Sequence, residues 1–192
     1  RVLDIGSGNG HHVKLLKKNG YNAEGVDKSS AMVKSAKEKY PKCSFKQGDV
    51  LESMLYPGDS FSTITCLYFT IYYINDKKQF FQNCYNWLMP GGYLVLHLVN
   101  RDKFDPILNA ADPLHLVSAQ KYAKERITNS LVKFNDFQYK ANFSLDKSKN
   151  LAEFDETFKD DKSGHVRQNK HKLHMETQKH ILGLAKNVGF IL

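Results

Sequence analysis

The chain of 192 residues has few cysteines and no long hydrophobic run. Cys43, Cys66 and Cys84 are odd in number and lack the spacing of metal ligands, so they indicate reduced thiols of an intracellular protein. The longest apolar stretches, residues 64–74 and 93–99, are too short to cross a membrane, and no signal-peptide pattern opens the chain. These absences predict a soluble, cytoplasmic protein without a membrane partner.

The chain also lacks a dense run of basic residues, although positive charge is in excess. The net charge is +8, and the lysines are spread along the sequence. Such a balance permits nucleic acid as a partner without requiring it. The length, together with an apolar fraction of 41%, predicts a globular domain with a sizeable core.

The first ten residues, RVLDIGSGNG, organise the rest of the chain. An apolar strand expected over residues 2–5 runs into Gly6, Gly8 and Gly10, and a helix is expected over residues 12–18. A turn without Cβ atoms lets backbone N–H groups approach a ligand closely, and the helix start adds a partial positive charge. A polar ligand that carries a carboxylate or a phosphate is therefore expected over this turn.

Two kinds of ligand suit such a turn. The dinucleotide fingerprint G-x-G-x-x-G needs its third glycine one residue later, where His11 stands. Asp4, just before the turn, would repel a pyrophosphate but would accept a hydrogen bond from an amino group. The pattern D-x-G-x-G-x-G resembles the first motif of class I S-adenosylmethionine-dependent methyltransferases, which holds the amino-acid end of the cofactor. A nucleotide-binding Rossmann turn is the alternative.

Two further expected strands end near acidic residues. The strand over residues 23–27 ends at Asp27, about twenty residues beyond the first glycine, where a carboxylate of doubly wound folds binds ribose hydroxyls. The strand over residues 43–47 is followed by Asp49, which could accept a hydrogen bond from the amino group of adenine. Three acidic strand ends in succession favour an adenosyl ligand.

Residues 27–32, DKSSAM, resemble the D-x-S-x-x-M pattern of the same methyltransferases, in which the methionine packs near the adenine. Core packing is the alternative for Met32. Ser29 or Ser30 is expected to cap a helix that ends before Pro41. The resemblance implies S-adenosylmethionine as the cofactor, held by Asp4, Gly6, Ser7, Gly8, Gly10, Asp27, Lys28, Met32, Asp49, Val50 and Leu67.

A second segment carries the resemblance further. A strand is expected over residues 61–68 and an amphipathic helix over residues 76–88. The motif L-x-P-G-G at residues 88–92 and an apolar strand over residues 93–99 follow. This succession resembles the segment of class I methyltransferases that leads into strand five, and nicotinamide dehydrogenases do not usually show it.

Candidate catalytic residues come from the ends of the later strands. Residues 69–76 resemble a segment of small-molecule methyltransferases in which an aromatic residue lines the pocket between cofactor and substrate. Tyr72 and Tyr73 are the candidates for that lining, and packing under the next helix is the alternative. His97 is a candidate base or a hydrogen-bonded core histidine. Weaker candidates for a proton acceptor are Glu156, Arg167 and His174.

The expected core is interrupted beyond Asn100. A loop over residues 101–113 and a short helix over residues 116–124 are expected to precede a three-stranded antiparallel meander with strands in residues 137–145, 152–158 and 166–175. Similar insertions serve as a substrate lid in some small-molecule methyltransferases, and this one is expected over the open end of the sheet. A helix over residues 178–188 and a strand from residue 190 are expected to return to the core.

The predicted fold is therefore α/β, a Rossmann-like doubly wound and mostly parallel sheet with a small antiparallel insertion. The expected domains are residues 1–100 for the cofactor-binding core, 101–175 for the inserted lid and 176–192 for the returning helix and strand. Because the chain opens inside a strand and stops as another begins, we expect it to be a fragment.

No metal site is expected, because His171, His174 and His180 do not converge on a strand followed by a helix. The implied reaction is in-line displacement at a sulfonium methyl group, in which the protein positions the reactants, excludes water and removes a proton. The favoured function is methylation of a small molecule at nitrogen or oxygen. A methyltransferase for RNA or another nucleic acid, and a non-catalytic S-adenosylmethionine-binding module, are the alternatives.

Overall fold

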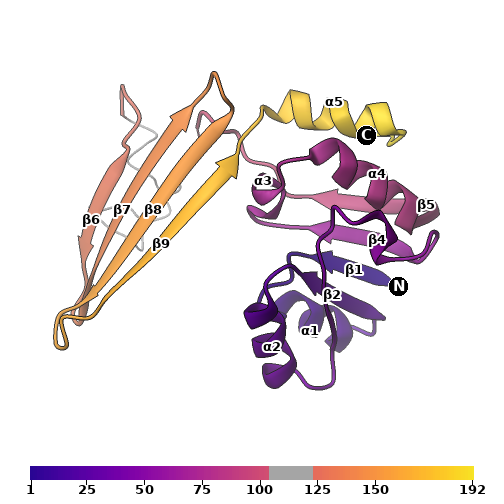
Figure 1. Ribbon diagram of the computed structural model, residues 1–192, viewed down its shortest axis with the longest axis horizontal. Helices are drawn as coiled ribbons and strands as arrows, with labels where there is room; N and C mark the ends of the chain where they lie inside the picture. Colours follow the sequence, from indigo (N-terminus) through magenta and orange to yellow (C-terminus); the bar gives the residue numbers. More distant parts are fainter. Residues whose placement is uncertain (104–122) are drawn as a thin grey trace. The chain divides into compact units, whose positions relative to one another are not determined.

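The computed structural model describes residues 1–103 and 123–192. Within it the chain forms two compact units, one of residues 1–98 and 179–192 and the other of residues 99–178 (Figure 1). The helix expected over residues 116–124 lies almost wholly outside the described residues, as does most of the loop expected over residues 101–113.

The first unit is built on a five-stranded sheet with the order β3-β2-β1-β4-β5, in which every neighbouring pair is parallel. This confirms the predicted doubly wound sheet. The strand order reverses between β1 and β4, which is the point where open sheets of this kind bind ligands at their carboxyl ends. The strands are β1 Val2–Ile5, β2 Ala23–Asp27, β3 Ser44–Gln47, β4 Phe61–Cys66 and β5 Leu88–Leu96.

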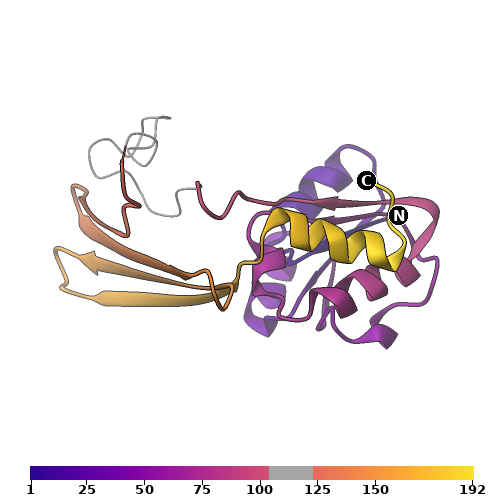
Figure 2. The same cartoon turned by 90° about the horizontal axis from the view of Figure 1, so that it is seen from above.

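The helices begin where the sequence provides caps. Ser29 Oγ accepts a hydrogen bond from the N–H of Met32 at 3.3 Å, and Asp76 Oδ1 accepts one from the N–H of Gln79 at 2.9 Å, so each caps the helix that follows it. Helices α1 and α2 cover one face of the sheet, and α4 and α5 cover the other (Figures 1 and 2). The helices are α1 His11–Lys18, α2 Ser30–Lys39, the 3-10 helix η1 Ser53–Leu55, α3 Thr70–Tyr73, α4 Lys77–Trp87 and α5 Gln178–Val188.

Apolar side chains fill both sides of the sheet. Val13 of α1 and Val33 of α2 pack with Phe45 of β3 in one cluster. On the other face, α4 buries Phe80, Phe81, Cys84 and Trp87 almost completely. This burial stabilises the framework that holds the strand ends in place.

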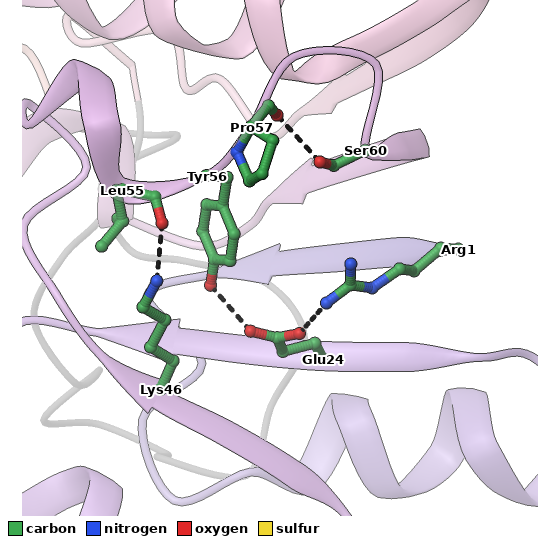
Figure 3. A network of polar contacts seen from close by, with 7 residues as sticks. All are labelled: Arg1, Glu24, Lys46, Leu55, Tyr56, Pro57 and Ser60. Carbon is green, nitrogen blue, oxygen red and sulfur yellow. Dashed lines mark hydrogen bonds and ion pairs between the residues drawn. The ribbon is translucent and has the colours of Figure 1, made fainter.

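A polar network around the buried Glu24 connects elements of the sheet away from the carboxyl ends of its strands (Figure 3). Glu24, near the start of β2, accepts a hydrogen bond from the Tyr56 hydroxyl at 3.0 Å and forms an ion pair with the guanidinium of Arg1. Lys46 Nζ donates to the carbonyl of Leu55 at 2.6 Å and lies 4.5 Å from the centre of the Tyr56 ring. Because its partners neutralise and hydrogen-bond it, this carboxylate can be buried in the strand.

The second unit is a four-stranded antiparallel sheet with the order β6-β7-β8-β9. The prediction of three strands was wrong by one, because β6 was missed. Only Val132 of that five-residue strand is buried. The sequence of the strand therefore shows little of the alternation of apolar and polar residues by which strands are predicted. The strands are β6 Asn129–Lys133, β7 Phe137–Asp146, β8 Leu151–Asp160 and β9 Val166–His174.

Other expectations about the strands were also wrong. Strand β5 is Leu88–Leu96 and not residues 93–99, so the L-x-P-G-G motif lies within it. Strand β4 ends at Cys66 and not at residue 68, because Tyr68 adopts a left-handed φ of 52° that no extended strand has. The strand expected from residue 190 is absent from the structure. The N–H of Phe190 donates to the carbonyl of Ala185 at 3.2 Å, and Ile191 is 99% exposed, so this segment closes the end of α5 and pairs with no strand.

None of the helices in the described parts of the chain has the length and apolar character needed to span a lipid bilayer.

Candidate active site

The glycine turn joins β1 to α1 with three left-handed residues, Gly6, Gly8 and Gly10, whose φ angles are 67°, 53° and 82°. A Cβ atom on Gly6 would lie 2.4 Å from Cγ2 of Thr70, and one on Gly10 would lie 2.4 Å from the ring of Phe45. These two glycines are therefore required by packing within the chain. A Cβ atom on Gly8 would meet nothing within 4 Å, so the space over the middle of the turn is open to a ligand.

Asp27, at the end of β2, ties the glycine turn to the next helix. Its Oδ2 accepts a hydrogen bond from the N–H of Gly8 at 2.8 Å, and its Oδ1 accepts one from the N–H of Ser29 at 2.9 Å. Each carboxylate oxygen can accept a second hydrogen bond. Asp27 can therefore hold the turn and still accept hydrogen bonds from two ribose hydroxyls, which fits its predicted role.

Asp4, in β1, carries the most informative polar atom of this region. Its side chain is buried, and Oδ1 accepts a hydrogen bond from the Thr65 hydroxyl at 2.7 Å. Burial raises the pKa of this carboxyl, against the smaller lowering effects of Thr65 and of His12. Its Oδ2 is buried and has no hydrogen-bond partner among the described residues, and neither has the buried Oγ of Ser7. Because buried polar atoms are normally paired, Asp4 fits the ammonium group of an amino-acid ligand.

Asp49 follows β3 and already has two partners. Its Oδ2 lies 2.7 Å from Nζ of Lys28, and its Oδ1 accepts a hydrogen bond from the N–H of Leu51 at 3.1 Å. The hydrogen bond from Lys28 lowers the pKa of Asp49. The Lys28 side chain is 81% exposed, so the pair is loose. An adenine amino group would share this carboxylate with Lys28 or displace it.

Sequence reasoning missed how α4 holds the loop after Asp49. The Nδ2 of Asn83 donates to the carbonyl of Val50 at 2.8 Å, and the Nε2 of Gln79 donates to Oδ1 of Asn83 at 2.8 Å. Trp87 Nε1 donates to the carbonyl of Ser53 at 3.3 Å. Residues 79, 83 and 87 form one stripe of the helix because they are four apart. The apolar periodicity predicted an amphipathic helix but gave no sign of these polar contacts.

The structure separates the two tyrosines predicted to line the pocket. Tyr72 is 0% exposed and Tyr73 is 51% exposed, so Tyr72 has no surface through which it could meet a substrate. Tyr72 is therefore a packing residue, which was the alternative interpretation. Tyr73 remains a candidate for the pocket lining. Met32 is 48% exposed, so core packing does not explain it. The backbone N–H of His97 donates to the carbonyl of Cys66 at 3.1 Å, which places this histidine at the end of β4.

Sequence reasoning also missed a cluster of three rings at the carboxyl end of the sheet. The rings of His12 and Tyr68 are stacked with centres 5.5 Å apart and planes 20° apart, and Tyr68 meets the ring of His97 edge-on at 6.1 Å. Neither His12 nor Tyr68 belongs to a motif that the sequence alone singles out. A cavity of about 430 Å³ beside α1 is lined by His12, Thr65 and Leu67 among others.

A larger cavity, of about 710 Å³, lies where α4 and α5 meet η1. Its lining includes the amides of Gln79, Asn83 and Asn187 but none of the acidic strand ends. The chemistry expected of the site lies at the strand ends and not in this larger space.

The weaker candidates of the second unit form contacts of their own. Glu156 accepts a hydrogen bond from the Tyr139 hydroxyl at 2.8 Å and lies 3.2 Å from Nε2 of His171. The guanidinium of Arg167 lies 4.5 Å from the centre of the Phe158 ring. His174 pairs with Leu151 in the strand ladder. In the described residues, no group of three or more histidine, cysteine or acidic side chains is arranged to hold a metal ion.

Comparison with known proteins relates this geometry to a family. Residues 2–92 match the family described as methyltransferase domain. Phosphoethanolamine N-methyltransferase of Plasmodium falciparum is 33% identical over 101 residues, which are 50% of this chain and 38% of that protein. Trans-aconitate 2-methyltransferase of Variovorax paradoxus is 29% identical over 100 residues, or 51% of this chain and 38% of that protein. The chain spans 36–40% of the length of the first curated relatives it matches.

The fold also matches solved structures over nearly the whole chain. CalS10 of Micromonospora echinaspora, an amino pentose methyltransferase solved with S-adenosylmethionine bound, has a TM-score of 0.71 and 18% sequence identity. The match covers 98% of this chain and 74% of that one. At this identity the likeness concerns the fold.

Proposed function

We propose that this chain transfers a methyl group from S-adenosylmethionine to a nitrogen or oxygen atom of a small molecule. The premise is that it belongs to the class I S-adenosylmethionine-dependent methyltransferase family. The cofactor supplies an electrophilic methyl group on a positively charged sulfur, together with its own leaving group. The protein therefore has to bind the cofactor, orient the acceptor and exclude water.

One observation carries the proposal: the buried Oδ2 of Asp4 has no hydrogen-bond partner among the described residues, and it lies in the strand that leads into an open glycine turn. In the proposed complex this oxygen accepts a hydrogen bond from the ammonium group of the cofactor, and the backbone N–H groups of the turn face its carboxylate. Asp27 binds the ribose hydroxyls on the neighbouring strand. Asp49 accepts the adenine amino group one strand further along. The strand order β3-β2-β1 supports this arrangement of adenine, ribose and amino acid along the edge of the sheet.

Small molecules are the proposed acceptors because the named relatives act on small molecules, phosphoethanolamine and trans-aconitate among them. A fold neighbour is named for an amino pentose. The acceptors in these names differ in chemistry. The proposal therefore names nitrogen or oxygen as the methylated atom and does not name the acceptor molecule. The inserted antiparallel sheet as a substrate lid, and a cytoplasmic location, stay predictions.

A nucleic acid acceptor is the second candidate, and the net charge of +8 favours it. The two candidates differ in their response to salt. An enzyme for nucleic acid should bind generic RNA with an affinity that falls steeply between 50 and 200 mM salt, by about 10³-fold or more for six or more phosphate contacts. Weak RNA binding that is insensitive to salt would remove this candidate.

The cofactor assignment can be tested by calorimetry and thermal shift with S-adenosylmethionine, S-adenosylhomocysteine and NAD. A ligand bound only by the folded state raises the apparent stability, so we expect both adenosyl ligands to stabilise the chain and NAD to leave it unchanged. Stabilisation by NAD alone would overturn the proposal. Incubation with a panel of amines, hydroxy compounds and carboxylates, followed by release of S-adenosylhomocysteine, then separates an enzyme from a non-catalytic binding module.

A further inference from the structure

The backbone of Tyr68 is strained. This residue has a φ of 52°, a region that bulky side chains rarely adopt. The other non-glycine residues with positive φ in the described chain are Asp59 and Asn150, whose short polar side chains tolerate this conformation. Strain of this kind persists only where the surrounding structure holds it, and it is concentrated at functional sites.

Burial does not explain why Tyr68 is held in this conformation. The residue is 64% exposed, so little apolar surface is removed from water in return. Two rings hold it instead: His12, stacked at 5.5 Å, and His97, edge-on at 6.1 Å. The three side chains come from the start of α1, the end of β4 and the end of β5, so the fold keeps an exposed phenol ring in one place at the edge of the sheet.

The Tyr68 ring lies at the same edge of the sheet as the proposed cofactor contacts. Asp49, Asp27 and the glycine turn follow β3, β2 and β1, and Tyr68 follows β4, the next strand in the sheet. A cofactor with its adenine at Asp49 and its ribose at Asp27 has its sulfur beyond the ribose, toward β4. The hydrogen bond from Thr65 of β4 to Asp4 of β1 places Oδ2 of Asp4, which has no partner within residues 1–103 and 123–192, at the same junction.

We infer that Tyr68 contacts the sulfonium group of S-adenosylmethionine, with the electron-rich face of its ring toward the positively charged sulfur and methyl, and that His12 and His97 hold the ring for this contact. The inference rests on the proposed function and deepens it. A cation over an aromatic face is attracted by the ring quadrupole. The contact orients the methyl group, and it distinguishes the charged cofactor from the neutral thioether that remains after transfer.

The test compares three ligands by calorimetry: S-adenosylmethionine, its stable ammonium analogue sinefungin, and neutral S-adenosylhomocysteine. Tyr68→Asn removes the ring with a residue that tolerates positive φ. We expect this variant to bind both cationic ligands about 3–10-fold more weakly and to bind S-adenosylhomocysteine within about twofold of wild type, without a loss of melting temperature. Tyr68→Phe keeps the ring and should keep the wild-type ratio of affinities.

Tyr93→Asn serves as the matched control, because Tyr93 is 72% exposed on β5 and makes no part of the ring cluster. An equal loss of affinity for the cationic and the neutral ligands in Tyr68→Asn would overturn the inference, as would no loss for either. Both results leave the proposed function intact. Wild-type protein that binds neither adenosyl ligand would instead overturn the proposed function and this inference with it.

Discussion

The backbone N–H of Gly8 donates a hydrogen bond of 2.8 Å to Oδ2 of Asp27. This contact connects the glycine turn after β1 with the carboxylate at the end of β2. The open space over Gly8 therefore lies beside the remaining hydrogen-bonding capacity of Asp27, where the proposed cofactor would meet both. The first two predictions concern these two residues.

Replacement of Asp27 by alanine should weaken S-adenosylhomocysteine binding by about 1–3 kcal/mol, because a charged acceptor is lost from the expected ribose site. Calorimetric titration measures this difference. Glu38→Ala should leave the affinity unchanged, because the carboxylate of Glu38 is exposed and its ion pair with Lys34 is long at 4.0 Å. Wild-type affinity in Asp27→Ala would show that the ribose lies elsewhere.

Replacement of Gly8 by alanine should affect binding more than folding. A left-handed alanine costs about 1–2 kcal/mol of stability, and no neighbour obstructs its Cβ atom. We expect cofactor affinity to fall further than this, because the methyl group would enter the space of the ligand. Gly20→Ala is the matched control, since Gly20 has a φ of 86° and an equally open surrounding. Urea unfolding with and without S-adenosylhomocysteine should show similar stability losses but a loss of binding only for Gly8→Ala.

Replacement of Asp4 by asparagine should stabilise the ligand-free protein at pH 7. Burial raises the pKa of this carboxyl, so the folded state binds the proton more tightly than the unfolded chain. The corresponding stability is fully present below the ordinary value of 3.8 and is lost as the pH rises through the raised pKa. The advantage of Asp4→Asn should therefore shrink as the pH falls from 7 toward 4.

The same variant should bind S-adenosylhomocysteine about 1–3 kcal/mol more weakly, because the charged partner of the ammonium group is lost. Urea titrations at several pH values and calorimetry at pH 7 measure the two effects. Asp136→Asn, at a side chain that is 67% exposed, should show neither. A gap in stability that does not change with pH would contradict the assigned cause.

Asn83 should influence recognition of the adenine without touching it. Asn83→Ala removes the donor to the carbonyl of Val50 and should lower the free energy of unfolding by about 1–3 kcal/mol. It should also reduce the preference for S-adenosylhomocysteine over S-inosylhomocysteine by roughly 3–10-fold, since the loop that carries Asp49 loses an anchor. Asn86→Ala, on the exposed side of the same helix, should change neither quantity. A loss of stability with the preference intact would leave Asn83 a purely structural role.

Tyr56 should contribute to stability and not to binding. Tyr56→Phe removes the hydroxyl that donates to buried Glu24 and should cost roughly 1 kcal/mol or more of stability, with cofactor affinity unchanged. Burial, followed by the charge of Glu24, raises the pKa of this phenol. The contribution of the protonated phenol to the free energy of unfolding is therefore complete below pH 10, its ordinary pKa, and is lost as the pH rises above that value. The difference between wild type and Tyr56→Phe in urea titrations should narrow above pH 10; an effect on cofactor affinity would contradict this division of roles.

The sequence was sufficient for most of the sheet and for its acidic strand ends, because each feature depends on local chemistry. Ser29 and Asp76 cap the helices that follow them, and alternating glycines permit a left-handed turn after β1. Parallel strands then bring Asp4 and Asp27 to one edge. None of these steps requires knowledge of a distant contact.

What the sequence could not predict depends on contacts between distant residues. The hydroxyl of Thr65 donates to Asp4 on the neighbouring strand, 61 residues away in the sequence. No sequence pattern predicts this hydrogen bond. Tyr72 and Tyr73 are adjacent in a four-residue helix, so the phase of one short turn decides which of them is buried. Strand β6 owes its pairing to β7 and not to an alternation of its own.

The ion pair between Lys28 and Asp49 changes what the adenine can contribute. In the proposed complex the base enters a position where an ammonium group already satisfies the carboxylate, so its arrival would substitute one donor for another. Breaking this exposed pair costs little free energy, so the new hydrogen bond would retain most of its contribution to affinity. The carboxylate would also provide selectivity: a base that presented an oxygen there would face the negative charge of Asp49 without a hydrogen to donate, and it would bind more weakly without any steric barrier.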